Sequence, residues 1–336
     1  MIKPTIFLAN PDELTLEEVI IRFNRNHEPQ EALKLVRDQC LQSDSSDVMK
    51  KGLEFLYING FYEDLPFLIQ KNKKSANPSN RQWGEVYEIV HIMLKKHQPH
   101  KILQRIDRLK VDGPALRWLI EFIKMTAYLN LNQYNKIGNF LAINQPMLDE
   151  INNRLLVSYF KSRSYQILLT YYMMRNELIM ARKYAYRLLN QTQNNTTKVN
   201  VHIKLGLSYT FESYCQAMVH FREALKLAKQ YNMTSHIYGI EQHNIPFISA
   251  QFYKVEGITS SDPSEQAHIE IAKGNNDKAI ELLSGLDINS PFKLYYVGRA
   301  KQDKKILLDS YHAFIRQRSD FFFSRLPFNI LKQMDG

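Results

Sequence analysis

Side chains that could bind a metal or act as nucleophiles are few and scattered in this sequence of 336 residues. The two cysteines, Cys40 and Cys215, lie far apart, whereas a zinc site or a disulfide framework needs clustered pairs. His97 and His100 flank Pro99 in a basic segment, and we interpret them as surface histidines. The sequence has no glycine-rich phosphate loop, no G-x-S-x-G, no HExxH and no Cys-x-x-Cys motif. We therefore expect neither an enzyme nor a cofactor or metal.

Two carboxylates stand at places where the local pattern gives them a structural role. In Asp262-Pro263-Ser264-Glu265, an aspartate precedes a proline and a glutamate follows three residues later. This order is typical of a capping box with proline at the first helical position. Asp320 follows Ser319 at an expected helix boundary, where an N-cap or a turn would use its side chain. Local pattern thus gives both residues a capping or turn role, and contact with a ligand stays open beside it.

The elements that position these residues are helical hairpins. The run Leu205-Gly206-Leu207-Ser208-Tyr209, followed by Ala217, Phe221 and Ala224, reads as one repeat of the tetratricopeptide type. A small residue lets the two helices approach, and the Ala/Phe/Ala spacing lines the inner face of the second helix. One such repeat cannot bury its apolar stripe alone, so neighbours must stack on it. Stacked repeats present a concave surface that binds peptides or partner proteins.

Helical patterns run along the whole chain, and no strand-like alternation is sustained. Further hairpins are expected at 116–129 with 134–141, at 155–174 with 177–189, and at 267–283 around a tight turn at 273–279. We expect a loop over Lys71–Arg81 and a break near Pro327. The prediction is an all-α fold, a right-handed superhelix of tetratricopeptide-like hairpins. We expect residues 1–336 to form a single domain, with more irregular helices over 1–113 and capping or dimerisation helices over 290–336.

The formal net charge of +10 biases the surface toward polyanions. The basic clusters are short, at Lys71/Lys73/Lys74, Lys95/Lys96/Lys101 and Arg316/Arg318. They fit either solvated helix faces or contact with nucleic acid or an acidic partner. No signal peptide and no apolar run long enough for a membrane span is found, so we expect a cytoplasmic protein.

Five segments together resemble the arbitrium receptors (AimR) of Bacillus phages, in the order of that family and over roughly residues 14–331. They are Arg81–Tyr87, Asn176–Ala185, Leu205–Phe211, Lys273–Ala279 and Tyr295–Lys305. The resemblance implies a helical-repeat regulator of a phage or prophage that binds a short signalling peptide and so controls transcription in the choice between lysis and lysogeny. It also implies a bacterial host. Family members begin with a helix-turn-helix DNA-binding domain, for which too few residues precede the shared region here. DNA binding therefore stays open, and either the chain lacks this domain naturally or its true start lies upstream.

The resemblance also implies a peptide groove. The family uses asparagines and an arginine there, and the aligned positions carry Thr170, Met174, Thr196 and Leu207. Methionine and leucine cannot replace the hydrogen bonds of buried amides, so the same peptide is not expected to bind in the same way.

Two groove positions match the family. Glu265 and Asp320 align with its acidic pair, which resembles a clamp for an arginine of the peptide. Carboxylates on neighbouring repeats can converge on one guanidinium group. The expected ligand is therefore a short peptide whose arginine contacts these two residues.

The resemblance also implies dimerisation through the C-terminal segment. Phe321-Phe322-Phe323, Phe328 and Leu331 offer more apolar surface than a terminal helix exposes to water. We expect a homodimer, or a mixed dimer with a complete receptor, through these residues; the alternative is that they pack inward. The alternative function is an interaction scaffold with no small peptide ligand, favoured by the apolar Met174 and Leu207.

Overall fold

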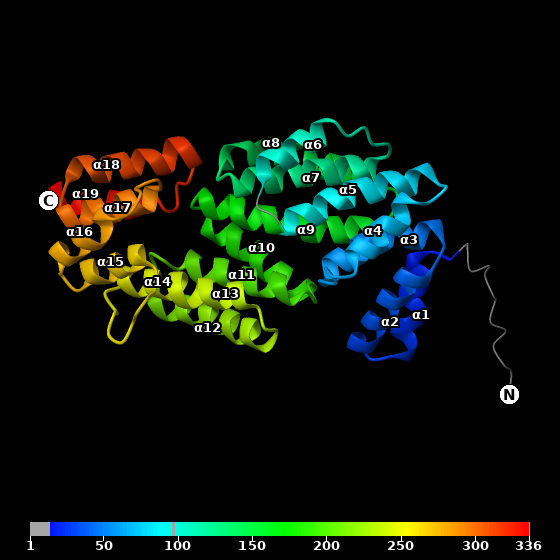
Figure 1. Cartoon of the computed structure of the whole chain (residues 1–336), viewed down its shortest axis with the longest axis horizontal. Coiled ribbons are helices and arrows are strands. Elements are labelled where there is room, and N and C mark those ends of the chain that lie inside the picture. The colour runs from blue at the N-terminus through cyan, green and yellow to red at the C-terminus, as the bar shows by residue number, and fades with distance from the viewer. Residues whose placement is uncertain (1–13, 96–97, 336) are drawn as a thin grey trace. The chain divides into compact units, whose positions relative to one another are not determined.

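The computed structural model describes residues 14–95 and 98–335, and every regular element in these ranges is a helix (Figure 1). His97 lies outside the described residues. The all-α fold class and the helical hairpins are thereby confirmed. The helices group into two compact units, where the sequence indicates no internal boundary. Unit 1 contains the described residues up to Leu131 together with Gly138–Ser164, and unit 2 contains Asn132–Ile137 together with Tyr165 and the described residues after it.

Unit 1 is built from short helices joined by tight connections. They are α1 (Leu16–Asn26), α2 (Pro29–Gln42), α3 (Ser46–Asn59), α4 (Leu65–Lys73), α5 (Pro78–Lys95), α6 (Pro99–Asp107), α7 (Pro114–Asn130), α8 (Ile137–Asp149) and the first half of α9 (Arg154–Met174). Gly60 ends α3 in the left-handed conformation, with φ of 84°, which glycine adopts without steric cost.

Among the residues that the structure describes, prolines begin helices more often than they interrupt them. Pro78 is the first residue of α5, where the missing backbone N–H costs nothing. The loop expected over Lys71–Arg81 is therefore too long, since α4 reaches Lys73 and α5 begins at Pro78. Pro327 likewise lies in the first turn of the last helix, which corrects the break expected there.

The core of unit 1 contains a buried ion pair. The Arg163 guanidinium donates to both oxygens of the Glu54 carboxylate at 2.7 Å, and Tyr87 donates its hydroxyl proton to the same carboxylate. The guanidinium also lies 3.6 Å from the centre of the Tyr57 ring. Both charged side chains are fully buried, and the two hydrogen bonds of the ion pair offset part of the loss of hydration, while the Nη1 atom of Arg163 has no hydrogen-bond partner.

Unit 2 continues the helical hairpins. Its elements are the 3₁₀ turn η1 (Tyr134–Lys136), the second half of α9, α10 (Leu178–Gln191), α11 (Asn195–Ser208), α12 (Tyr214–Gln230), α13 (Thr234–Gly239), the π-helical turn η2 (Ile240–Asn244), α14 (Ile245–Gln251), α15 (Pro263–Ala272), α16 (Asn276–Ser284), α17 (Pro291–Lys301), α18 (Lys304–His312), the π-helical turn η3 (Ala313–Arg318) and α19 (Arg325–Asp335).

The hairpin of α11 and α12 depends on a glycine at the helix crossing. A Cβ atom at Gly206 would lie 2.6 Å from the ring of Phe221, which is fully buried. The small residue therefore lets the aromatic ring fill the space between the helices, as the sequence predicts. In the hairpin of α15 and α16, Gly274 makes the tight turn with φ of 86°.

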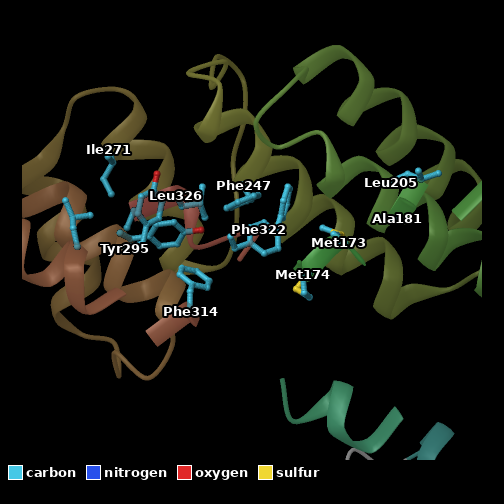
Figure 2. Close-up of a cluster of buried hydrophobic side chains, with 14 of the residues drawn as sticks. Met173, Met174, Ala181, Leu205, Phe247, Ile271, Tyr295, Phe314, Phe322 and Leu326 are labelled. Carbon is cyan, nitrogen blue, oxygen red and sulfur yellow. The ribbon is translucent and has the colours of Figure 1, made fainter. Parts of the chain in front are cut away.

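The core of unit 2 gathers side chains from α9 through α19 (Figure 2). Phe322 and Phe323 belong to this core and are buried, so the expectation that they face a dimer partner was wrong for these two residues. They turn inward because the N–H groups of Phe321 and Phe322 both donate to the Met174 carbonyl oxygen, at 2.8 and 3.1 Å. Phe321 and Phe328 remain exposed, and Leu331 is partly buried.

None of the helices formed by the described residues combines the length and apolar character that crossing a membrane requires.

Candidate functional site

Glu265 lies in the first turn of α15 and points away from the helix end. The Asp262 carboxylate caps α15 by accepting from the N–H groups of Ser264 and Glu265, so the N-cap half of the expected capping box is present. The Glu265 side chain does not return to the cap. Its Oε1 atom accepts a hydrogen bond of 3.0 Å from the Tyr296 hydroxyl of α17, and its buried Oε2 atom has no hydrogen-bond partner.

Asp320 lies in the turn between η3 and α19. Ser319 ends η3 in the left-handed conformation, with φ of 56°, and the chain then reverses toward α19. The Asp320 Oδ1 atom accepts from the Phe323 N–H at 2.9 Å, which is the turn role that its position indicates. The side chain is buried, with 2% of its surface exposed.

Both carboxylates line one cavity of unit 2, which we call the acidic pocket. Its volume is about 370 Å³, within the ~300–1,000 Å³ that small-ligand sites occupy. One side is aromatic and apolar, and the polar groups converge from several elements. The lining residues are Asn132, Tyr134, Leu207, His243, Asn244, Phe247, Glu265, Phe292, Tyr296, Arg318, Asp320 and Phe323.

The pocket holds its carboxyl groups in an environment that opposes ionisation. Burial raises the pKa of Glu265 to about 8, a rise that the nearby Asp262 charge reinforces and the Tyr296 hydrogen bond partly offsets. Burial raises the pKa of Asp320 to about 7, although the hydrogen bond from the Phe323 N–H and the positive charge of Arg318 both lower it. Near pH 7 Glu265 therefore retains its proton and Asp320 is close to its titration midpoint, and a cation entering the pocket would favour the ionised form of both.

A second layer of polar groups lies behind Glu265. His268, one helical turn further along α15, is fully buried between Tyr296 and Phe247. Arg299 of α17 is buried beside it, 3.4 Å from its Nε2 atom. No pattern in the sequence singles out these residues, because they come together only when α15 and α17 pack. The Tyr295-Tyr296 pair, four and three residues before Arg299, is the one signal that could have drawn attention to them.

The structure separates the other groove residues expected from the sequence. Leu207 lines the acidic pocket. Met174 is buried in the core, and its backbone carbonyl holds the turn before Phe322. Thr196 lies in the first turn of α11, three helical turns from Leu207 and away from the pocket lining.

Thr170 interacts with a lysine that the sequence analysis missed. The Lys204 ammonium group donates to the Thr170 hydroxyl, which in turn donates to the Gln166 carbonyl oxygen at 3.1 Å. Burial lowers the pKa of Lys204 to about 8. A lysine between the apolar residues Ile203 and Leu205 of α11 was the available signal.

The described part of the chain has no cluster of three or more His, Cys, Asp or Glu side chains suited to a metal ion. The two carboxyl groups and the aromatic side chains that line the acidic pocket suit an organic cation. The carboxyl groups would take the charge, and the aromatic walls would take an apolar stem or a planar guanidinium face.

Comparison with known proteins decides the family. The family model described as AimR transcriptional regulator-like matches residues 32–333. The chain belongs to this family. The AimR transcriptional regulator of Bacillus phage SPbeta is 25% identical over 98% of this chain and 89% of its own length. That of Bacillus phage phi3T is 21% identical over 97% of this chain and 89% of its own.

A solved structure shares the fold. The phAimR–ligand structure superposes with a TM-score of 0.80 at 20% sequence identity, covering 97% of this chain and 99% of its own. Family membership makes this chain a relative of transcriptional regulators and not of enzymes.

Proposed function

We propose that this protein is a transcriptional regulator that responds to a short peptide, and that the acidic pocket holds an arginine side chain of that peptide. The observation that carries the proposal is the placement of two buried carboxyl groups in the wall of one cavity, one of them with an unpartnered oxygen. A buried polar atom without a partner costs stability, and a cationic ligand would supply the missing donor.

An arginine fits this pocket better than a lysine does. The planar guanidinium can donate to two carboxylates at once while its face stacks on an aromatic ring. Each charged hydrogen bond contributes about 1.5–3 kcal/mol, enough to offset ionisation of the carboxyl groups. The name of the phAimR–ligand structure supports ligand binding in a protein of this fold.

Ligand binding would act by shifting the population between two states of unit 2. The pocket wall joins α15, α17 and the turn at Asp320, and this turn is tied by backbone hydrogen bonds to the end of α9. A ligand that bridges Glu265 and Asp320 favours the arrangement in which these elements are close. The resemblance to the arbitrium receptors implies that such a change controls the choice between lysis and lysogeny, in the cytoplasm of a bacterial host.

The exposed part of the C-terminal segment remains our proposed dimer surface. Phe321 and Phe328 are 45% and 40% exposed, and Phe328 stacks on Tyr311 at 5.8 Å between ring centres. The alternative function, an interaction scaffold without a peptide ligand, is favoured in the sequence by the apolar residues Met174 and Leu207. Met174 lies in the core and does not face a groove, so only Leu207 still favours this alternative.

Isothermal titration calorimetry with short peptides tests the proposal. The panel carries arginine at each position in turn, and each peptide has a partner in which neutral citrulline replaces the arginine. We expect at least one arginine peptide to bind, and its citrulline partner to bind at least tenfold more weakly. The Glu265→Gln/Asp320→Asn double variant should lose this preference.

A matched control comes from the same helix. Glu270 of α15 is also buried, but its carboxylate is paired with Lys273 and Lys278, so Glu270→Gln should retain binding. If no arginine peptide gave heat at micromolar protein, the acidic pocket would not be a peptide site.

A further inference from the structure

Behind the acidic pocket, two buried polar atoms face each other without forming a hydrogen bond. The Oε2 atom of Glu265 and the Nδ1 atom of His268 are 3.8 Å apart, and each lacks a hydrogen-bond partner in the structure. Both side chains are on α15, one helical turn apart, and the imidazole is fully buried. Native interiors rarely leave two such atoms unsatisfied side by side, so the pair calls for an explanation.

Arg299 fixes which nitrogen of His268 carries the proton. A guanidinium group has donors and no acceptor, so in its contact of 3.4 Å the Nε2 atom of His268 must accept. A neutral imidazole with an accepting Nε2 carries its proton on Nδ1. Burial, together with the Arg299 charge, holds the pKa of His268 well below its usual value, and the ring therefore stays neutral. The Nδ1–H bond thus points toward the free oxygen of Glu265.

Arg299 is itself held in place by tyrosines. Its guanidinium donates to the hydroxyl groups of Tyr295 and Tyr253, both at 3.1 Å. No carboxylate of the described residues pairs with it, in contrast to the paired Arg163 of unit 1. The positive charge of Arg299 therefore polarises His268 and favours the ionised form of the Glu265 carboxyl on the other side of the imidazole.

The distance of 3.8 Å has a simple meaning when Glu265 is a neutral acid. A carboxylic acid gains little from a second N–H donor, whereas a carboxylate gains a charged hydrogen bond. Ionised Glu265 would have two buried donors, the Tyr296 hydroxyl on Oε1 and the His268 Nδ1–H on Oε2 after a small side-chain shift. The structure thus contains the partners of a carboxylate around a group whose surroundings keep it protonated.

We propose that the acidic pocket takes up the guanidinium of its ligand in exchange for the proton of Glu265, and that His268, oriented by Arg299, is the positioning residue for the resulting carboxylate. The O–H bond of the acid breaks, the proton leaves to solvent, and the electron pair stays on the carboxylate that faces the ligand. This inference rests on the proposed function.

Other titratable groups also face Glu265 and affect this exchange. The negative charge of Asp262 at the N-cap of α15 opposes ionisation of Glu265, and Asp320 in the same pocket would oppose it as well once it has lost its own proton. The positive charge of Arg318 of η3 favours ionisation, and the His243 side chain of η2 also lines the pocket. The phenol of Tyr134 in η1 also lines the pocket, and burial raises its pKa to about 12, so it stays neutral.

The first test reads the tautomer in the ligand-free protein. In protein labelled with ¹⁵N at histidine, long-range ¹H–¹⁵N spectra distinguish a protonated Nδ1 from a protonated Nε2, and His268→Phe assigns the signal by its loss. We expect the Nδ1–H tautomer from about pH 5 to 9, and loss of this preference in Arg299→Met. An Nε2–H tautomer or an imidazolium ion at His268 would overturn the inference, whatever binds in the pocket.

The second test counts protons with a defined probe, N-acetyl-arginine methylamide, and with its citrulline analogue as the neutral control. Calorimetry in phosphate and in Tris near pH 7 should show proton release when the arginine probe binds, and about one proton fewer in Glu265→Gln, where only the Asp320 carboxyl can still release one. His268→Phe, which keeps a ring against Tyr296, should weaken binding about tenfold or more. His268→Asn should recover much of this loss, because its amide N–H replaces Nδ1–H.

The outcomes distinguish the proton exchange at Glu265 from the proposed peptide site. Binding of the arginine probe without proton release, or with an unchanged affinity in His268→Phe, would refute the exchange and leave the proposed peptide site standing. If neither the probe nor any arginine peptide binds, both proposals fail. A general loss of folding in His268→Phe would appear in its circular dichroism, and His268→Asn would then decide the role of the Nδ1 donor.

Discussion

Replacing Glu265 with glutamine should stabilise the protein near neutral pH. Burial raises the pKa of Glu265 from its ordinary value of 4.5 to about 8, so the folded state holds the proton more tightly than the unfolded state. Folding therefore carries no penalty from this group below about pH 4, and the penalty grows as the pH rises through the interval between the two pKa values. Since one pKa unit corresponds to about 1.4 kcal/mol, the penalty is about 3 kcal/mol near pH 7. Glutamine keeps the shape and removes the ionisation.

The assay is urea unfolding followed by circular dichroism at several pH values, with hydrogen exchange of the α15 amides to assign the change to unit 2. We expect the stability advantage of Glu265→Gln to be small near pH 4 and to reach a few kcal/mol near pH 8. The control is Glu270→Gln on the same helix. Hydrogen bonds from Asn275 and Lys273 lower the pKa of Glu270 to about 2, so this substitution should destabilise at neutral pH. An advantage of Glu265→Gln that does not change with pH would refute the reasoning.

Three further predictions concern packing and assembly. Gly206→Ala should destabilise unit 2 by about 1–2 kcal/mol, because overpacking against Phe221 outweighs the gain in helix propensity. The control is Gly239→Ala, which has open space at its Cβ position and should not destabilise the unit. Thermal unfolding of the two variants makes the comparison. Arg163→Met should cost about 3–5 kcal/mol in urea unfolding because it removes the ion-pair partner of the buried Glu54, and adding Glu54→Leu should restore much of that loss. Phe328→Ser should shift light-scattering mass toward the monomer, and an unchanged dimer would place the interface elsewhere.

The local pattern of the sequence predicts the helical hairpins because the physical causes are local. Gly206 and Phe221 are fifteen residues apart on one hairpin, and the need for a small residue opposite a large ring can be read directly. Proline is more ambiguous. The same residue ends a helix or occupies its first turn, and only packing decides, as Pro78 and Pro327 show.

The pocket could be predicted only in part. The family resemblance identifies Glu265 and Asp320, and both line the acidic pocket. The groups behind Glu265 could not be predicted, since His268 and Arg299 meet across two helices whose packing angle no local pattern encodes. The direction of Phe322 depends on a backbone hydrogen bond to Met174, about 150 residues away in sequence, which local patterns do not specify.

The most direct measurement is a double-mutant cycle between peptide and protein. It combines arginine or citrulline in the best-binding peptide with glutamate or glutamine at position 265. If the guanidinium contacts this carboxylate, replacing arginine by citrulline costs tenfold or more in affinity with the native protein and little with Glu265→Gln. An equal loss in both proteins would show that the arginine binds elsewhere, and the acidic pocket would then have another use.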